Sequence, residues 1–577
     1  MLPYALVASV IATTLALPRA ERPSISPSIG RRDAIAVTIL LVIVIPLYCI
    51  GVYTIPWQVN TDEVAFMSVA RGVMAETRPD IFGLSWYFGC PVAAFVFFGK
   101  VAQLLGGIDL YHVRLSQSIL GVACVVAAYV LFRRFLPTMP ALIAAGILGA
   151  NHSLIAYSRM ANWHGSSLFL EIAALICLAI GIQNRSKRFL FLAGISCGTA
   201  FYFYFPGRII IALCMLILVA AWVAGIDERR LKPLISSAFL LMLGWGLVTA
   251  PIIIASAKAP PQSMQYQREQ LLIYPEGRKA AQSWTNTKSE RAAWIANASN
   301  GLRAFNAPIV DHGWLYANYN HGFADPATGI LLWVGFLLVV SRLFRQLRAR
   351  LTASGERWLS IGLGDTIALT GFLLLYLSLA FLVTKAPNYQ RLLMLLPFLA
   401  YFTGVGLWWL LGGALSALSS RIIALRNQHL LPASASMTVI GIFVANALIF
   451  GDFVTVGRTN GHEVGSTGRF VEARKAERGH TWILAADKEH LYYWWGEPVW
   501  WQGWLGFFAA VPDQKVRVVP VAALDTLRTP GPSTVFIARP FWEQKEGSFR
   551  VANLVKGVTN ILPDGRLVAV EVSGGRQ

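Results

Sequence analysis

Long apolar runs separated by short polar turns restrict how this chain can fold more than any other feature. About eleven of them have membrane-spanning character: residues 34–56, 113–132, 141–157, 167–182, 189–205, 209–224, 233–255, 329–340, 367–384, 392–411 and 434–453. Charged residues make up only 14% of the 577 residues, whereas soluble domains carry roughly 25%. Because lipid offers the backbone no hydrogen-bond partners, such runs are expected to be helices. The sequence therefore predicts an all-α polytopic membrane protein.

Lysine and arginine residues collect after every second apolar run, which sets the predicted orientation. Arg31 and Arg32 precede the first run, and later basic clusters lie at residues 133–134, 185–188, 229–232, 342–350 and 421–426. Positively charged loops stay in the cytoplasm. Residues 1–33 are then a cytoplasmic tail, and residues 34–453 a transmembrane domain with external loops at 57–111 and 256–325. The net charge of +19 indicates topology; no basic stretch is long enough to follow the phosphates of a nucleic acid.

The composition changes after the last apolar run. In residues 454–577 charged residues become frequent, and four strand-like stretches, at 482–485, 516–519, 535–538 and 567–572, are separated by turn signals. We expect a small mixed α/β domain outside the membrane. Its aromatic run at residues 492–504 is equally consistent with contact to the membrane, contact to a sugar or packing in the core.

Two adjacent carboxylates, Asp62 and Glu63, follow the first apolar run directly. Residues 63–75 after them read as an amphipathic helix, whose N-terminus acidic side chains suit. A second apolar piece at residues 86–105 is broken by Gly89, Pro91 and Gly99. That piece is predicted to be re-entrant or interfacial; if it spanned the membrane instead, the orientation of every later segment would be reversed. Arg31 and Arg32 before the first run place the carboxylate pair on the external side.

Five predicted external turns carry ionisable or polar side chains: Asp62 and Glu63; His112 and Arg114; Arg159, Asn162 and His164; Arg208; and Lys385, Asn388, Tyr389 and Arg391. Each also has a plainer interpretation, such as snorkelling for the arginines or a helix start for the acids. Together they supply a carboxylate base and several cations. That set suits transfer of a sugar from a lipid-linked phosphate to an acceptor hydroxyl with inversion. Cations stabilise the departing phosphate, and a carboxylate base takes the proton of the attacking hydroxyl.

The chain resembles the polytopic glycosyltransferases of the GT-C fold, close to the lipid A aminoarabinose transferases and the protein O-mannosyltransferases. The resemblance covers roughly residues 34–452 and rests on the overall layout and on five motifs: N-T-D-E-V-A-F-M-S-V-A-R-G-V at 60–73, H-V-R-L-S-Q-S-I-L-G at 112–121, the Ser158–Arg159 turn, A-D-P-A-T-G-I-L-L-W-V-G at 324–335 and N-Y-Q-R-L-L-M-L-L-P at 388–397.

The resemblance implies that Asp62 is the catalytic base and Glu63 its neighbour, and that Arg159, Lys385 and Arg391 hold the lipid phosphate. We expect Arg208 to add a further cation. It also implies a polyprenyl-phosphate sugar donor, an extracytoplasmic glycan, lipid or protein acceptor, and a bacterial inner membrane.

Two departures from the family narrow these expectations. Relatives often carry a second acid about five residues after the arginine of the Ser158–Arg159 turn, and this chain has His164 there. That substitution argues against a divalent metal held between two external carboxylates, although the sequence leaves a metal open, and it indicates no other cofactor. The W-W-D-Y-G motif of oligosaccharyltransferases is absent from the sequence, which argues against transfer of whole oligosaccharides to asparagine.

Two other function classes remain open at this point. A transporter or flippase for lipid-linked glycans often shows internal repetition and ionisable residues inside its spans. In this chain no such repeat is evident, and the ionisable residues lie in the turns. A ligase that joins a preassembled glycan to an acceptor would share the external site.

Overall fold

The computed structural model describes residues 12–14, 16, 30–56, 59, 61–85, 89–224, 231–259, 265–307, 321–352, 362–419, 430–456, 462–474, 480–485, 516–520, 531–539, 555–561 and 567–573. Within these ranges nine segments are long and apolar enough to cross a membrane. They are α2 (Arg31–Cys49), α5 (Leu110–Arg133), α8 (His164–Gln183), η1 with α10 (Phe205–Ile209, Ile210–Val223), α11 (Leu231–Lys258), α15 (Pro326–Thr352), α16 (Leu363–Phe381), α17 to α18 (Tyr389–Leu392, Leu393–Leu395, Leu396–Ser419) and α19 (Leu430–Val456). The predicted polytopic helical fold is confirmed, and the protein is an integral membrane protein.

A bent helix pair supplies a tenth candidate span. Helices α6 (Thr138–Ala150) and α7 (His152–Ser158) meet at an angle of 61°. Asn151 forms the break, because its side chain accepts hydrogen bonds from the N–H groups of Ser153 and Leu154, both at 3.1 Å, and so caps α7. The same side chain donates to the carbonyl of Phe323 at 3.0 Å. The bend is therefore fixed by the hydrogen bonds of Asn151 to the start of α7 and to the Phe323 carbonyl.

The remaining predicted span corresponds to α9 (Lys187–Ala200), which has only 14 residues. It packs closely between α8 and α11 rather than standing alone in lipid. A Cβ added at Gly194 would lie 2.1 Å from the carbonyl oxygen of Leu241, so only glycine permits this approach of α9 to α11. Small residues at such contacts are typical of helix packing in membranes.

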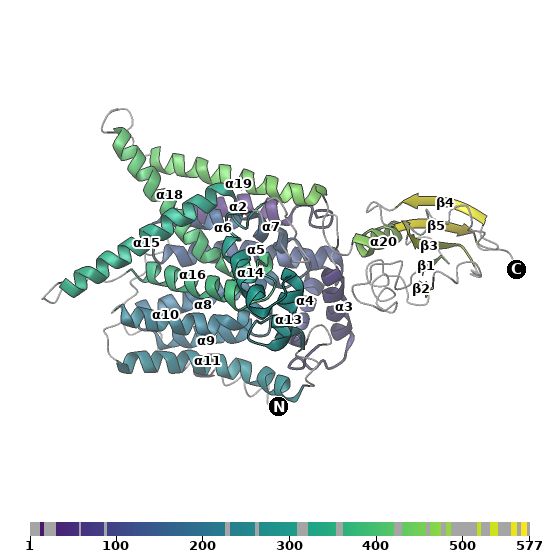
Figure 1. Ribbon diagram of the computed structural model, residues 1–577, viewed down its shortest axis with the longest axis horizontal. Coiled ribbons are helices and arrows are strands. Elements are labelled where there is room, and N and C mark those ends of the chain that lie inside the picture. Colours follow the sequence, from purple (N-terminus) through teal and green to yellow (C-terminus); the bar gives the residue numbers. More distant parts are fainter. Residues whose placement is uncertain are drawn as a thin grey trace.

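Two short helices lie together at one end of the bundle, which we call the loop end (Figure 1). The predicted helix at 63–75 is α3 (Thr61–Ala75), and α4 (Val92–Leu105) follows it. Phe66 on α3 contacts Phe95 and Phe98 on α4, with ring centroids 5.2 and 5.6 Å apart. The apolar side of α3 is thus covered by protein, and α4, with 14 residues, is shorter than the candidate spans. Helices α12 (Gln265–Glu269), α13 (Pro275–Thr285) and α14 (Glu290–Arg303) belong to the second long loop.

A five-stranded sheet and α20 (His462–Ala473) form the C-terminal domain, beyond α3 in Figure 1. The strand order is β2-β1-β3-β5-β4. Strands β1 (Thr481–Ala485), β2 (Val516–Val519) and β3 (Ser533–Ala538) pair in parallel, and β5 (Leu567–Ser573) runs antiparallel to β3 and to β4 (Val555–Ile561). Four strands match the sequence prediction. The fifth, β4, was missed because Gly557 interrupts its apolar pattern, and its register shifts there. The aromatic run at 492–504 lies outside the described residues.

One arginine joins this domain to the membrane bundle. Arg469 of α20 donates a hydrogen bond to the carbonyl of Tyr53 at 2.6 Å, and its guanidinium lies 4.8 Å from the centre of the Tyr53 ring. Tyr53 follows α2 in the segment that leads to α3. The C-terminal domain therefore contacts the segment that also positions the candidate site.

Candidate active site

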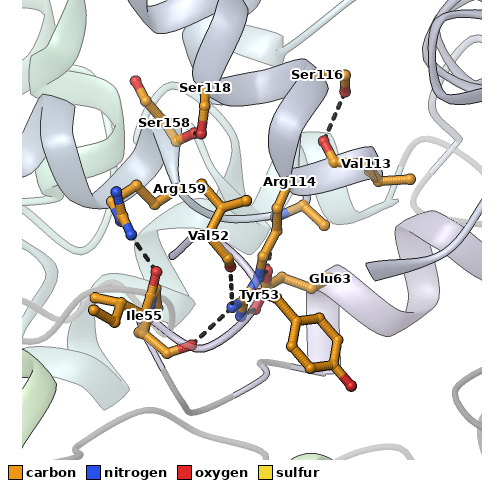
Figure 2. Close-up of polar contacts among 12 residues, drawn as sticks. Val52, Tyr53, Ile55, Glu63, Val113, Arg114, Ser116, Ser118, Ser158 and Arg159 are labelled. Carbon is orange, nitrogen blue, oxygen red and sulfur yellow. Dashed lines mark hydrogen bonds and ion pairs between the residues drawn. The ribbon is translucent and has the colours of Figure 1, made fainter. Parts of the chain in front are cut away.

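A buried ion pair holds α3 against α5 at the loop end (Figure 2). Arg114 donates from Nε and Nη2 to the two carboxylate oxygens of Glu63, at 2.9 and 3.0 Å. Its Nη1 donates to the carbonyls of Val52 and Pro56, at 3.1 and 2.7 Å. The N–H of Ala161 donates to Glu63 Oε1 at 2.7 Å. Both side chains are at most 1% exposed, so this pair fixes four chain segments in one place.

Arg159 performs a similar task next to this pair. It donates to three carbonyls, those of Ile55 at 3.0 Å, Leu47 at 2.6 Å and Ile50 at 2.6 Å, and so closes the C-terminal end of α2. A cation is favourable at this negative end of a helix. Burial, and then the charge of Arg114, lowers the pKa of Arg159 to about 10. We call Glu63, Arg114 and Arg159 the charged anchor.

The motif at residues 112–121 explains how α5 fits against the anchor. Ser118 donates a hydrogen bond to the carbonyl of Ser158 at 3.0 Å (Figure 2). A Cβ at Gly121 would lie 2.3 Å from Ser158 Oγ, so α5 needs a glycine there to reach the Ser158–Arg159 turn. At the start of the motif, His112 bonds to Asp109 at 2.7 Å and belongs to the N-terminal cap of α5. His112 and Arg114, both predicted site residues, thus serve the structure of α5 and α3.

A pocket lined by Asp62 opens next to the charged anchor. Four predicted site residues line it: Asp62, Asn162, His164 and Arg208. Asp62 comes from the first turn of α3, Asn162 and His164 from the start of α8, and Arg208 from η1. The sequence placed these residues in three separate turns, and the structure brings them together.

The other lining residues, which the sequence analysis did not select, are mostly aromatic side chains and glutamines. The aromatic wall comprises Phe66, Trp163, Phe203, Tyr204, Phe205 and Tyr266. The carboxamide group comprises Asn162 together with Gln267, Gln270 and Gln390. Gln390 stands between two predicted residues in N-Y-Q-R, which was a usable signal. Gln267 and Gln270 lie in a polar loop without any motif, so nothing in their surroundings distinguished them.

Asn162 and His164 hold each other in one orientation. Asn162 Oδ1 accepts a hydrogen bond from the backbone N–H of His164 at 3.2 Å and another from His164 Nδ1. Since an amide oxygen only accepts, Nδ1 carries the ring proton and Nε2 is an acceptor. The same bonds turn Asn162 Nδ2 away from His164. In the described part of the chain this buried Nδ2 has no hydrogen-bond partner. A buried donor without a partner marks a position where a ligand can bind.

Arg208 enters the pocket from the Pro206–Gly207 turn. Its guanidinium lies over the rings of Phe201 and Phe205, 4.8 and 5.1 Å from their centres. Nη1 donates to Gln267 at 2.5 Å, while the buried Nε finds no partner within the described residues. Stacking and one hydrogen bond hold the planar fork in place and leave donors for an anion.

Arg391 lies behind the pocket wall. It donates from Nη1 to the carbonyl of Thr384 at 3.1 Å and from Nη2 to the side chain of Gln270, which lines the pocket. Lys385, with a φ of 61°, places its ammonium 5.3 Å from the centre of the Trp284 ring. Burial, followed by the charge of Arg391, lowers the pKa of Lys385. Neither cation lines the pocket.

Tyr389 and Asn388 take structural positions in the same turn. The hydroxyl of Tyr389 donates to the carbonyl of His321 at 2.7 Å, and its ring packs against Phe323. Asn388 precedes α17 and lines a smaller cavity together with Arg391. The predicted cationic turn at 385–391 therefore reaches the pocket directly only through Gln390.

The described residues contain no group of three or more His, Cys, Asp or Glu side chains arranged to hold a metal ion. A thiol, Cys90, also lines the pocket. Burial raises its pKa to about 12, although the charge of Arg208 opposes that shift. Cys90 is therefore a neutral thiol at physiological pH and a poor nucleophile.

The chain is similar to known membrane glycosyltransferases. The profile of the dolichyl-phosphate-mannose-protein mannosyltransferase family matches residues 90–254. The crystal structure of ArnT from Cupriavidus metallidurans bound to undecaprenyl phosphate superposes with a TM-score of 0.55 at 14% identity, over 96% of this chain and 100% of ArnT. The apo form gives a TM-score of 0.52 at 14% identity, over 94% and 99% of the two chains. No curated protein matches by sequence. The chain thus has the GT-C fold and resembles the ArnT and protein O-mannosyltransferase group.

Proposed function

We propose that this protein is a membrane glycosyltransferase that moves a sugar from a polyprenyl-phosphate donor to an acceptor hydroxyl outside the cytoplasm. One observation carries the proposal: the carboxylate of Asp62 and the guanidinium of Arg208 line the same pocket. The reaction needs a base and an anion-binding cation on one site. ArnT, which shares the fold, was crystallised with undecaprenyl phosphate. The matching family profile is also named for a polyprenyl-phosphate sugar.

The residues of the pocket divide the reaction between them. Asp62 accepts the proton of the acceptor hydroxyl while that oxygen forms the new bond to the anomeric carbon. The bond from this carbon to the phosphate oxygen breaks, and the phosphate keeps the electron pair. Arg208 binds the departing phosphate. Arg391, which is hydrogen-bonded to Gln270 in the pocket wall, adds to the positive potential at the phosphate. Attack from the face opposite the phosphate inverts the anomeric centre.

The charged anchor has a different role in this proposal. Glu63 points away from the pocket to Arg114, and Arg159 uses its donors on the end of α2. Both were expected to take part directly, Glu63 beside the base and Arg159 on the phosphate. Their contacts support positioning roles instead, because they hold the segment that presents Asp62.

The test is transfer of a labelled sugar in proteoliposomes that contain the donor and an extract of the native envelope as acceptor. Asp62→Asn should lower the rate about a hundred- to ten-thousand-fold, because asparagine keeps the shape of the side chain but cannot take the proton. Glu76→Gln is the matched control, since this exposed acid lies just after the same helix. A product with an inverted anomeric centre is expected. Wild-type rates in Asp62→Asn would overturn the proposal, as would retention of configuration.

A further inference from the structure

Of the described residues that line the pocket, few are charged and many are neutral and polar, and this balance bears on the kind of sugar that can bind. Among the described residues that line it, Asp62 is the carboxylate and Arg208 the guanidinium. His164 donates from Nδ1 to the amide oxygen of Asn162, and its ring also bonds to the side chain of Gln390, so it is a neutral group held by two amides. The other lining residues are the aromatic wall, the rest of the carboxamide group, Cys90 and Pro91.

The proposed reaction uses both of these charged side chains. Asp62 takes the proton of the acceptor, and Arg208 binds the phosphate. Among the described lining residues, an ammonium on the sugar would then find no further carboxylate, and a carboxylate on the sugar would find no further cation. An unpaired charge in a partly buried site is strongly unfavourable. Arg391 does not change this balance for an acidic sugar, because the proposed reaction assigns its charge to the phosphate together with Arg208, and its Nη2 is bound to Gln270.

The neutral groups match a different ligand. Carboxamides both donate and accept hydrogen bonds, as sugar hydroxyls do. The Nδ2 of Asn162, buried and without a partner in the described chain, is a donor that awaits an oxygen acceptor. Aromatic side chains cover the apolar face of a ligand while a few placed polar groups orient it.

We infer that the sugar on the donor is uncharged and rich in hydroxyl groups, with Asn162 Nδ2 donating to one of its oxygens. This inference rests on the proposed function, because it assigns Asp62 and Arg208 to the reaction. It predicts that the pocket disfavours donors that carry an aminosugar or a uronic acid.

The experiment measures equilibrium binding of three donors to the full-length protein in lipid nanodiscs. The donors share one short polyprenyl-phosphate chain and carry a neutral hexose, an aminosugar or a uronic acid. The neutral donor should bind at least about tenfold more tightly than either charged one. A charged donor that binds as tightly as the neutral one would overturn the inference. Absence of binding by all three would overturn the inference and the proposed function together.

One substitution supplies the missing charge with little change of shape. Asn162→Asp keeps an oxygen for the N–H of His164, and aspartate caps a helix about as well as asparagine. We expect the aminosugar donor to gain about tenfold relative to the neutral donor. Asn286→Asp is the control, because this exposed residue ends α13 away from the pocket lining and tolerates the same change. An unchanged ratio in Asn162→Asp would contradict the inference.

Transfer assays on the same samples separate the two proposals. Binding of the neutral donor without transfer to any envelope acceptor would refute the glycosyltransferase assignment and leave the sugar class standing. Efficient transfer from the aminosugar donor would refute the sugar class and support the glycosyltransferase assignment. If Asn162→Asp fails to fold, the comparison of the three donors on the unmodified chain still decides the matter.

Discussion

The charged anchor and the pocket beside it use the same kinds of side chain in opposite ways. Glu63, Arg114 and Arg159 are almost fully buried, and each makes two or more hydrogen bonds, Glu63 and Arg114 to each other and to backbone groups, Arg159 to carbonyls. In the pocket, Arg208 Nε and Asn162 Nδ2 are buried without partners in the described chain. Hydrogen-bonded charges of the first kind hold chain segments in place and are costly to break, while buried donors of the second kind are available to a ligand. Proximity to Asp62 alone does not make a residue part of the chemistry.

The largest effect on stability is expected from Arg114→Ala. Glu63 would remain buried without its partner, which typically costs about 3–5 kcal/mol. Thermal unfolding in detergent and the yield of monodisperse protein should both fall sharply. The double variant Glu63→Gln with Arg114→Met should recover part of the loss, because neither buried charge remains. An unfolding temperature equal to that of the wild type in Arg114→Ala would show that the anchor is dispensable.

Arg208→Lys should weaken donor use without harming the fold. Lysine keeps the charge but loses the planar fork and the stacking on Phe201 and Phe205. We expect kcat/KM for the donor to fall about 10- to 100-fold, equivalent to about 1.4–2.8 kcal/mol. Arg268→Lys, at an exposed arginine of α12, is the matched control. Equal kinetics in the two variants would remove Arg208 from the phosphate site.

Arg159→Lys separates positioning from phosphate binding. A single ammonium cannot reach all three carbonyls at the end of α2 as the guanidinium does, so thermal stability should fall by about 1–3 kcal/mol. The KM for the donor should rise less than it does in Arg208→Lys. A large rise in KM at unchanged stability would indicate that Arg159 binds the phosphate and would contradict its positioning role.

The smallest effect is expected at the contact between the two domains. Arg469→Ala removes one hydrogen bond and one stacking contact to Tyr53, worth about 1–2 kcal/mol together. Limited proteolysis should release the C-terminal domain faster, while unfolding of the membrane bundle stays unchanged. Identical cleavage rates in variant and wild type would show that other contacts hold the domain.

The sequence predicted the spans and part of the pocket because both depend on local patterns. Hydropathy marks the helices, and ionisable residues in turns led to Asp62, Asn162, His164 and Arg208. It could not separate Glu63 from Asp62, since the partner of Glu63 lies 51 residues away on α5. Gln267 and Gln270 were missed because glutamine in a polar loop is unremarkable until the fold brings it to a pocket. Which of several cations face a ligand is decided by tertiary contacts.

The two adjacent carboxylates, Asp62 and Glu63, are assigned different roles, and one paired measurement tests this assignment most directly. Asp62→Asn and Glu63→Gln are compared for single-turnover transfer and for thermal unfolding in the same proteoliposome preparation. Asp62→Asn should lose about a hundred- to ten-thousand-fold in rate with unchanged unfolding, and Glu63→Gln should lower the unfolding temperature and lose much less in rate per folded molecule. The reverse pattern, with a stable Glu63→Gln that has no activity and an active Asp62→Asn, would contradict the assignment of the two acids.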